Sequence, residues 1–193
     1  RPPSDVVPTY TGTGPDSHPL PPVFAAGHRF PPAEATGVAD GRSQHLGPLV
    51  KADGRWRIFL FGGTENPTQP TSAAYQFFDF LAHDITSPVR KYTPQGTDID
   101  SVIDTYAVFQ QQYLSMHDLP DYLWPAKGKY GLRDYEKVFH PQTGNDVFDL
   151  RGIDRSGGCV VIVRPDQHIA NILPVMAHAE LAKFFDVFMI EQG

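Results

Sequence analysis

The sequence predicts an α/β protein whose mixed sheet is flanked by helices, with an extended Pro-rich arm at its N-terminus. Short runs of branched and aromatic residues have the length of buried strands, and they alternate with segments whose apolar residues recur at helical spacing. Proline supplies a further observation, because residues 1–32 hold 9 of the 19 prolines in the chain. Since proline lacks an N–H and disfavours helix before it, this stretch is expected to be extended.

We place the boundary between the two parts near residue 26, with an arm or linker over 1–26 and the globular domain over 27–193. The chain begins at Arg1, inside the Pro-rich stretch, and shows no charged segment followed by an apolar one. We therefore expect an internal cut in a longer polypeptide and no targeting segment.

The first half of the domain predicts a strand, a helix and a second strand. The aromatic and branched run Arg55–Phe61 predicts a buried strand. Ser72–Thr86 predicts a helix, because its apolar residues recur at helical spacing and Ser72 can cap the N-terminus. Pro88 is expected to end this helix. Val102–Phe109 predicts the second strand.

The second half predicts a hairpin and a final helix after a long irregular stretch. The expected elements are a short helix over Leu132–Phe139, strands over Gly158–Val163 and Ile169–Leu173, and a helix over Met176–Ile190. Arg164–Gln167 supplies the hairpin turn, with proline in the second position that it favours. The resulting order, β-α-β-(α)-β-β-α, is a thioredoxin-type arrangement, with a mixed sheet and helices on both faces.

Charge and hydropathy exclude some classes of partner. The 193 residues include 16 Lys and Arg against 22 Asp and Glu, so the formal net charge is −6. An acidic chain lacks the electrostatic footprint of a nucleic-acid-binding protein. The longest apolar runs, such as Ile58–Phe61 and Val160–Val163, are too short to cross a membrane. We expect no nucleic-acid or membrane partner.

The single cysteine restricts the chemistry further. With Cys159 alone, one chain can form no disulfide, no Cys-X-X-Cys redox pair and no cysteine-rich zinc site. Its apolar neighbours predict a small buried side chain, not a reactive thiol. Nothing in this cysteine usage indicates an oxidising compartment, and we expect a cytoplasmic protein.

In a thioredoxin-like fold, the redox site would follow the first strand, at a helix N-terminus that lowers the pKa of a thiol. Residues 61–68 read Phe-Gly-Gly-Thr-Glu-Asn-Pro-Thr and contain no cysteine. Cys159 lies on a later predicted strand. We therefore expect the thioredoxin-like scaffold without thiol chemistry.

Other motifs give no convincing site. Gly12-Thr13-Gly14 lacks the preceding strand, third glycine and following helix of a dinucleotide loop. The eight histidines include no i, i+4 pair, so a metal site has no sequence support. Asp98 with Asp100, and Asp149 with Asp154, are expected to be turn residues or ion-pair partners. The sequence predicts no catalytic, cofactor-binding or metal-binding residue in this chain.

Several segments, taken in order, resemble one known family. They are Gly27–Pro31, Ala39–Arg42 with Leu46, Asp53–Gly63, Asp149–Arg155 and Gly158–Asp166. Together they resemble the C-terminal domain of the phenol 2-monooxygenase (phenol hydroxylase) family of flavin-dependent aromatic hydroxylases. The resemblance runs from about Gly27 to the end. Gln167 departs from the pattern, since a glycine is expected after Asp166.

The resemblance implies a thioredoxin-like dimerisation domain without redox cysteines. Members of the family use FAD, NADPH and oxygen to hydroxylate phenols, and their flavin site belongs to the N-terminal part of the full-length enzyme. No cofactor is therefore expected in this chain, whereas FAD and NADPH are expected in a full-length parent. The expected partner is a second copy, giving a homodimer, or an upstream flavin domain.

Two other functions stay open on the sequence. The chain could be a free-standing, redox-inactive thioredoxin-like binding protein. It could also be an independent enzyme with a site built from the loops Thr64–Thr71 and Pro120–Gly131. Tyr122, Trp124 and Tyr130 could line such a site, although we favour aromatic side chains that fix an irregular loop to the core.

Overall fold

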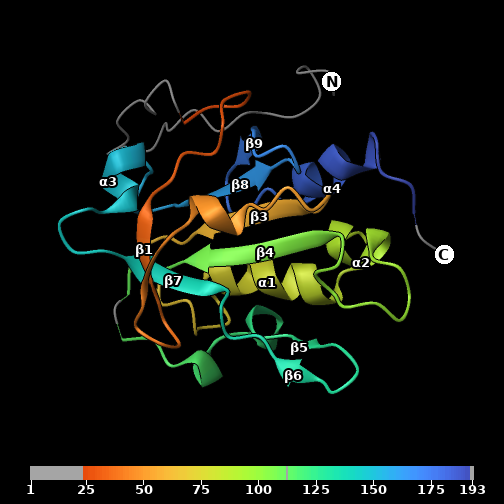
Figure 1. The fold of residues 1–193 in the computed structure, drawn as a ribbon, viewed down its shortest axis with the longest axis horizontal. Helices are drawn as coiled ribbons and strands as arrows, with labels where there is room; N and C mark the ends of the chain where they lie inside the picture. The colour runs from red at the N-terminus through yellow and green to blue at the C-terminus, as the bar shows by residue number, and fades with distance from the viewer. Residues whose placement is uncertain (1–23, 112, 192–193) are drawn as a thin grey trace.

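A computed structural model describes residues 24–111 and 113–191, and its centre is a seven-stranded mixed sheet. The strand order is β2-β1-β7-β4-β3-β8-β9, and helices cover the sheet (Figure 1). β3 is parallel to β4, and β4 to β7, whereas β8 and β9 continue the sheet in antiparallel fashion beyond β3. A separate two-stranded ribbon, β5-β6, lies outside this sheet. The predicted thioredoxin-like α/β fold is confirmed.

The strands are short, and most of their residues are buried. Their bounds are β1 Glu34–Gly37, β2 Ser43–His45, β3 Trp56–Phe61, β4 Ile103–Val108, β5 Ala126–Lys127, β6 Leu132–Arg133, β7 Val138–Pro141, β8 Cys159–Val163 and β9 Ile169–Leu173. The four strands expected near residues 55, 102, 158 and 169 are β3, β4, β8 and β9.

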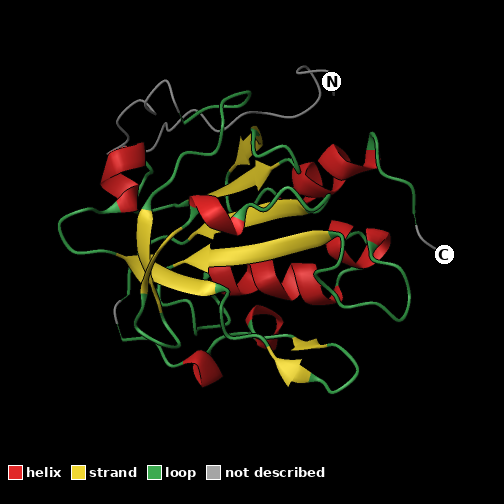
Figure 2. Cartoon of the chain, viewed as in Figure 1, coloured by secondary structure: helices red, strands yellow, loops and turns green. Residues whose placement is uncertain are grey.

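In the described part of the chain, four α-helices and three 3-10 turns accompany the sheet (Figure 2). The helices are α1 Ala73–His83, α2 Pro88–Tyr92, α3 Val147–Arg151 and α4 His178–Asp186; the 3-10 turns are η1 Gly47–Leu49, η2 Met116–Asp118 and η3 Asp121–Leu123. Among the described residues no helix has both the length and the apolar character needed to cross a membrane.

Two apolar cores lie on opposite faces of the sheet, because side chains alternate along each strand. In β3, Ile58 and Leu60 contribute to the core beneath α1, α2 and α4, whereas Phe59 and Phe61 contribute to the other. The second core is covered by α3 and by the segment from Phe24 to Val50. Phe24 packs edge-on against Phe61, so the described chain joins this core at its first residue.

The first predicted helix is confirmed, but its end differs. The Ser72 hydroxyl accepts a hydrogen bond from the Tyr75 amide, as expected of an N-cap. The helix ends at His83, where the Asp84 carboxylate turns the chain by accepting the Thr86 amide at 2.7 Å. Pro88 does not end this helix. It opens α2, in a position where a missing N–H costs nothing.

Two further helix predictions are corrected. Residues 132–139 form no helix: β6 ends at Arg133 and β7 begins at Val138. The one-turn helix between β4 and β8 lies later, at Val147–Arg151, where Asp146 caps the Phe148 amide. The last helix is also shorter than the predicted Met176–Ile190, because turns at Pro174–Ala177 and after Asp186 replace both ends.

The hairpin turn explains the departure at Gln167. Its backbone has φ 71°, a left-handed conformation that usually falls to glycine, and it is the one described non-glycine residue with positive φ. Hydrogen bonds of the Gln167 side chain offset the cost of this conformation. Its amide donates to the Val50 carbonyl at 2.9 Å, and its oxygen accepts from Arg29. The predicted arm over 1–26, with Gly12-Thr13-Gly14, lies almost entirely outside the described residues.

Candidate functional site

The loop after β3 occupies the position where a thioredoxin-like redox site would lie, and it leads into the N-terminus of α1. The Glu65 carboxylate accepts a hydrogen bond from the Ala73 amide at 2.8 Å, and the Ser72 hydroxyl accepts from the Tyr75 amide at 3.2 Å. A helix N-terminus stabilises an anion placed against its free amides. Here the chain's own carboxylate has that place.

Glycines bring the backbone around this loop into close contact. A Cβ atom added at Gly63 would lie 2.3 Å from the Ser156 carbonyl oxygen, and one at Gly158 would lie 2.1 Å from the Phe61 carbonyl oxygen. Gly158 also has φ +65°, which L side chains rarely adopt. The turn before β8 is therefore packed directly on the loop after β3.

Two glutamines hold the same loop from the end of β4. The Gln110 side-chain amide donates to the carbonyls of Gly62 at 3.0 Å and Arg155 at 2.8 Å. The Gln111 amide donates to the carbonyls of Thr64 at 3.1 Å and Glu65 at 2.8 Å. These amides satisfy loop carbonyls that have no strand partner, so the loop is fixed by side chains.

Cys159 cannot serve as a nucleophile in this arrangement. It is fully buried in β8, opposite Phe61 in β3, as the sequence predicted for a small core residue. Burial raises the pKa of the Cys159 thiol far above its ordinary value, and the nearby Asp154 carboxylate adds to this. Because the thiolate is the nucleophilic form, the thiol is unreactive while the fold is intact.

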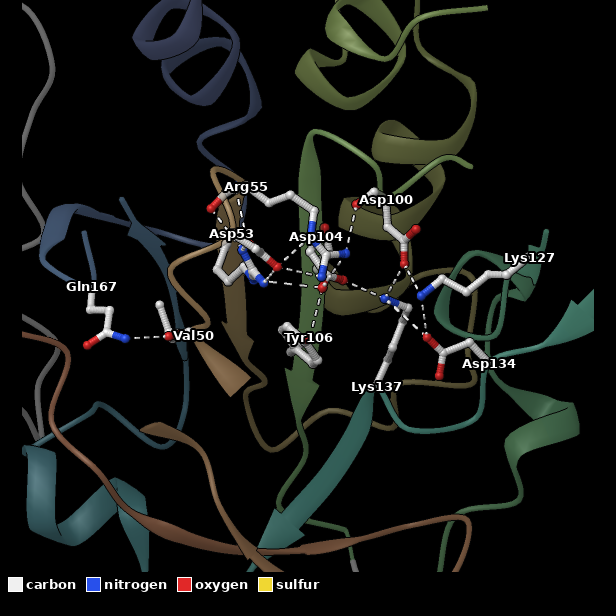
Figure 3. A network of polar contacts seen from close by, with 12 residues as sticks. Val50, Asp53, Arg55, Asp100, Asp104, Tyr106, Lys127, Asp134, Lys137 and Gln167 are labelled. Carbon is white, nitrogen blue, oxygen red and sulfur yellow. Dashed lines mark hydrogen bonds and ion pairs between the residues drawn. The ribbon is translucent and has the colours of Figure 1, made fainter. Parts of the chain in front are cut away.

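A network of ion pairs at the start of β3 is the most unusual polar feature of the fold (Figure 3). The Arg57 side chain is fully buried, and its two terminal nitrogens contact the two Asp53 oxygens at 2.7 and 2.8 Å. Arg55 also binds Asp53, at 2.8 Å. Hydrogen bonds from Arg57, opposed by partial burial and reinforced by Arg55, hold the pKa of Asp53 well below its ordinary range.

Asp104 of β4 continues the network across the sheet. It is the register partner of Arg57, and its carboxylate lies 3.7 Å from Arg57 Nε and 3.4 Å from Arg55. The Tyr106 hydroxyl donates to it at 2.8 Å. Lys137, just before β7, contacts it at 2.5 Å. Asp104 therefore links three neighbouring strands.

The far end of the network reaches the β5-β6 ribbon. Lys137 contacts Asp100 at 2.7 Å, and Lys127 of β5 contacts Asp100 at 2.6 Å and Asp134 at 2.8 Å. Burial alone would raise the pKa of Asp100, but Lys137 and Lys127 outweigh it and hold that pKa below its ordinary value. The four carboxylates face four cations, so the network is neutral as a whole. It holds charges in place and offers no unpaired acid or base.

The sequence did not predict this network. One signal was available, because Arg57 interrupts an otherwise apolar run, and a buried arginine needs an acidic partner. The prediction for the aspartate pairs is confirmed: Asp100 and Asp149 are ion-pair partners of Lys137 and Arg155, and Asp98 opens a turn in which its carbonyl accepts the Ser101 amide at 2.9 Å. Asp154 caps a turn by accepting the Ser156 amide at 3.0 Å.

Aromatic side chains in the irregular stretch mostly fix it to the domain. Tyr122 packs against Phe78, and its hydroxyl lies 3.0 Å from that of Thr105. Trp124 stacks on Tyr135, with ring centroids 5.9 Å apart. Tyr130 behaves differently, since 77% of it is exposed.

Of two clefts formed by described residues, neither is lined by the loops Thr64–Thr71 and Pro120–Gly131. The larger cleft, of about 470 Å³, is lined by Gln110, Gln142, Asp146, Asp149 and Arg155 among others. Its charged groups pair with one another, because Arg155 lies 2.8 Å from both aspartates. Within the described ranges, no group of three or more His, Cys, Asp or Glu side chains could hold a metal ion.

Comparison with known proteins decides the family. The model of the "Phenol hydroxylase, C-terminal dimerisation domain" family matches residues 4–193. The chain belongs to this family. The match begins well before Gly27, so it takes in most of the Pro-rich stretch that the resemblance had left out. Two relatives of the chain are named as monooxygenases. One is a 3-hydroxybenzoate 4-monooxygenase of Comamonas testosteroni, 46% identical over 86% of this chain and 27% of the relative.

A second relative and two solved structures complete the comparison. The FAD-dependent monooxygenase terD of Aspergillus terreus is 33% identical over 86% of this chain and 28% of its own length. A putative protein disulfide isomerase from Bacteroides thetaiotaomicron has a TM-score of 0.52 at 12% identity, covering 87% of this chain and 90% of that one. A thioredoxin domain from Bacteroides vulgatus has a TM-score of 0.51 at 14% sequence identity, covering 86% of this chain and 99% of that one. These structures show the thioredoxin-like fold of the dimerisation domain.

The described residues of this phenol hydroxylase-type domain do not fit a flavin cofactor. A dinucleotide needs free helix N-terminal amides for its pyrophosphate. The junction between β3 and α1 in the described chain joins a strand, glycines and a helix, but there Glu65 already accepts the first helical amide. The space beside the two glycines of this junction is filled, because Phe109 packs against Gly62 and Ser156 packs against Gly63. The chain spans about a quarter of the length of the two monooxygenases.

Proposed function

We propose that this chain is the self-association domain of a larger FAD- and NADPH-dependent monooxygenase that hydroxylates an aromatic compound. The family match over residues 4–193 carries the proposal. The two monooxygenase relatives support it, because their names give FAD for one and hydroxylation of a benzoate for the other. The flavin, the nicotinamide cofactor and the reacting groups would then lie in a part of the parent protein outside these 193 residues.

The role of the domain within that parent is assembly. Its redox position is closed by Glu65 and by the glycine contacts, and its cysteine is buried. These features support a scaffold whose surface carries its function. We propose a homodimer as the main assembly, with an upstream flavin domain as a further neighbour, residues 1–26 as the connecting arm, and the cytoplasm as the location.

Sedimentation of the purified chain over a range of concentrations tests the proposal. We expect a dimer of the 21.4 kDa chain with a measurable dissociation constant. A monomer at every concentration would refute self-association. The intact mass and visible absorbance of the protein from its source test the parent: a mass several times larger with a flavin spectrum supports it, whereas 21.4 kDa and no colour would indicate a free-standing protein.

A further inference from the structure

The β5-β6 hairpin and the adjoining 3-10 turns expose apolar and charged side chains together. Figure 1 shows the hairpin well away from the seven-stranded sheet. Tyr130 is 77% exposed and Leu132 71% exposed. We define the hairpin surface by six exposed residues: Asp118, Asp121, Lys129, Tyr130, Leu132 and Arg133.

This surface is held rigidly from below. Lys127 at the hairpin base joins Asp100 and Asp134, and the Gly128 amide donates to Asp98 at 2.9 Å. A loop that is exposed only for solubility needs no such anchoring. Rigid presentation lowers the entropy that is lost when a partner binds, so this construction suits a docking surface.

An aromatic platform joins the hairpin to the 3-10 turns. Trp124 stacks on Tyr135, packs edge-on against His117 of η2 at 5.4 Å, and lies under the Arg133 guanidinium at 4.8 Å. The cations of the hairpin and the anions of the turns therefore belong to one continuous patch.

The charges on this patch are self-complementary. The hairpin carries the cations Lys129 and Arg133, and the turns carry the anions Asp118 and Asp121. None of these four forms an ion pair with any residue that the structure describes. In a two-fold dimer the same patch meets itself, so the cations of one copy can face the anions of the other.

We infer that the hairpin surface is the contact between two copies of this chain, with each hairpin lying against the η2-η3 turns of the other copy. This inference rests on the proposed self-association and names its surface. Tyr130 and Leu132 would form its apolar centre.

A charge exchange tests the pairing. One variant carries Lys129→Glu and Arg133→Glu, and the other carries Asp118→Lys and Asp121→Lys. Either variant on its own places like charges opposite each other in both halves of the two-fold contact, so it is expected to be monomeric. An equimolar mixture of the two variants restores the complementary contacts and is expected to form a heterodimer. Sedimentation of each variant and of the mixture gives the result, and circular dichroism with thermal unfolding checks that each is folded.

An uncharged variant keeps the inference testable if a charge variant fails to fold. Tyr130→Ser with Leu132→Ser is expected to raise the dimer dissociation constant at least about 100-fold, because a two-fold interface contains each lost contact twice and a tenfold loss per copy is then squared. Val187→Ser is the matched control. Val187 is 48% exposed at the end of α4, away from this patch, and its loss is expected to leave the constant unchanged.

The outcomes separate the inference from the proposed function. If the unchanged chain is a dimer and the hairpin variants dimerise as tightly, the hairpin inference is wrong and self-association stands. If both charge variants are monomeric and their equimolar mixture is also monomeric, the inferred pairing of the hairpin with the η2-η3 turns is wrong. If Val187→Ser alone disrupts the dimer, the contact lies at α4. If the unchanged chain is a monomer, the proposed function and this inference both fail.

Discussion

Replacing Lys137 by methionine tests whether the buried ion network stabilises the domain. Lys137 is 3% exposed and contacts two buried carboxylates, Asp104 at 2.5 Å and Asp100 at 2.7 Å. Methionine keeps most of the apolar stem and removes the charge. The network then holds four carboxylates against three cations. Breaking a buried pair from one side costs about 3–5 kcal/mol, because a buried charge loses its partner.

The matched control is Lys127→Met, which removes a cation from the same network nearer the solvent. Lys127 is 31% exposed and also contacts Asp100, at 2.6 Å. Partly exposed pairs are screened by water and contribute about 0–1 kcal/mol. For a domain of this size, 1 kcal/mol corresponds to about 2–4 °C in Tm. We therefore expect Tm to fall by about 6–20 °C for Lys137→Met and by at most about 4 °C for Lys127→Met.

Thermal unfolding followed by tryptophan fluorescence and circular dichroism measures the Tm of both variants. The double variant Lys137→Met with Asp104→Asn is expected to be more stable than Lys137→Met alone, because it restores equal numbers of carboxylates and cations in the network, three of each. Equal losses for the two lysines, or no recovery in the double variant, would show that the buried position of Lys137 does not set its contribution.

Four other predictions follow from the same structure. The folded-state pKa of Asp100 lies below its unfolded value of about 3.9, so its contribution to stability is present above that pH and is lost as pH falls through the folded value. The urea concentration at the unfolding midpoint should therefore decrease as the pH is lowered below about 4–5, and it should decrease less steeply in Asp100→Asn. In thermal unfolding, Gly158→Ala should lower Tm far more than Gly128→Ala. The two glycines have nearly the same φ, +65° and +63°, but only a Cβ at Gly158 would collide with backbone atoms. A thiol reagent should label Cys159 only after unfolding, and rapid labelling of folded protein would contradict its burial. Phe184→Ala should cost about 3–5 kcal/mol in urea unfolding, since Phe184 is 4% exposed.

Much of the sheet could be predicted because its central strands are specified locally. β3, β8 and β9 are short runs of branched and aromatic residues with clear turns at their ends, and Ser72 marks the start of α1 with a side chain that caps it. Such signals depend on neighbours in sequence, and they survive folding because the buried faces agree with them.

The failures arise where tertiary contacts decide. Residues 132–139 have apolar residues at helix-like spacing, but Lys137 must reach Asp104 and Asp100 across the sheet. That contact and the pairing of Val138 with Ala107 favour a strand. β1 is likewise polar and short, and it is a strand because β7 supplies its partner. No window of local sequence contains these distant residues.

The redox position shows how a thioredoxin-like scaffold can support a different task. A helix N-terminus can stabilise one anion at its first amides, and here the carboxylate of Glu65 is that anion. Gln110 and Gln111 then hold the loop, and glycines allow the turn before β8 to close over it. Each contact that fixes this region also removes a group that could act on a substrate. The remaining groups able to recognise another molecule lie on the surface, and the hairpin surface concentrates them on a rigid base. This division supports the proposed assembly through that surface, with chemistry in another part of the proposed parent protein.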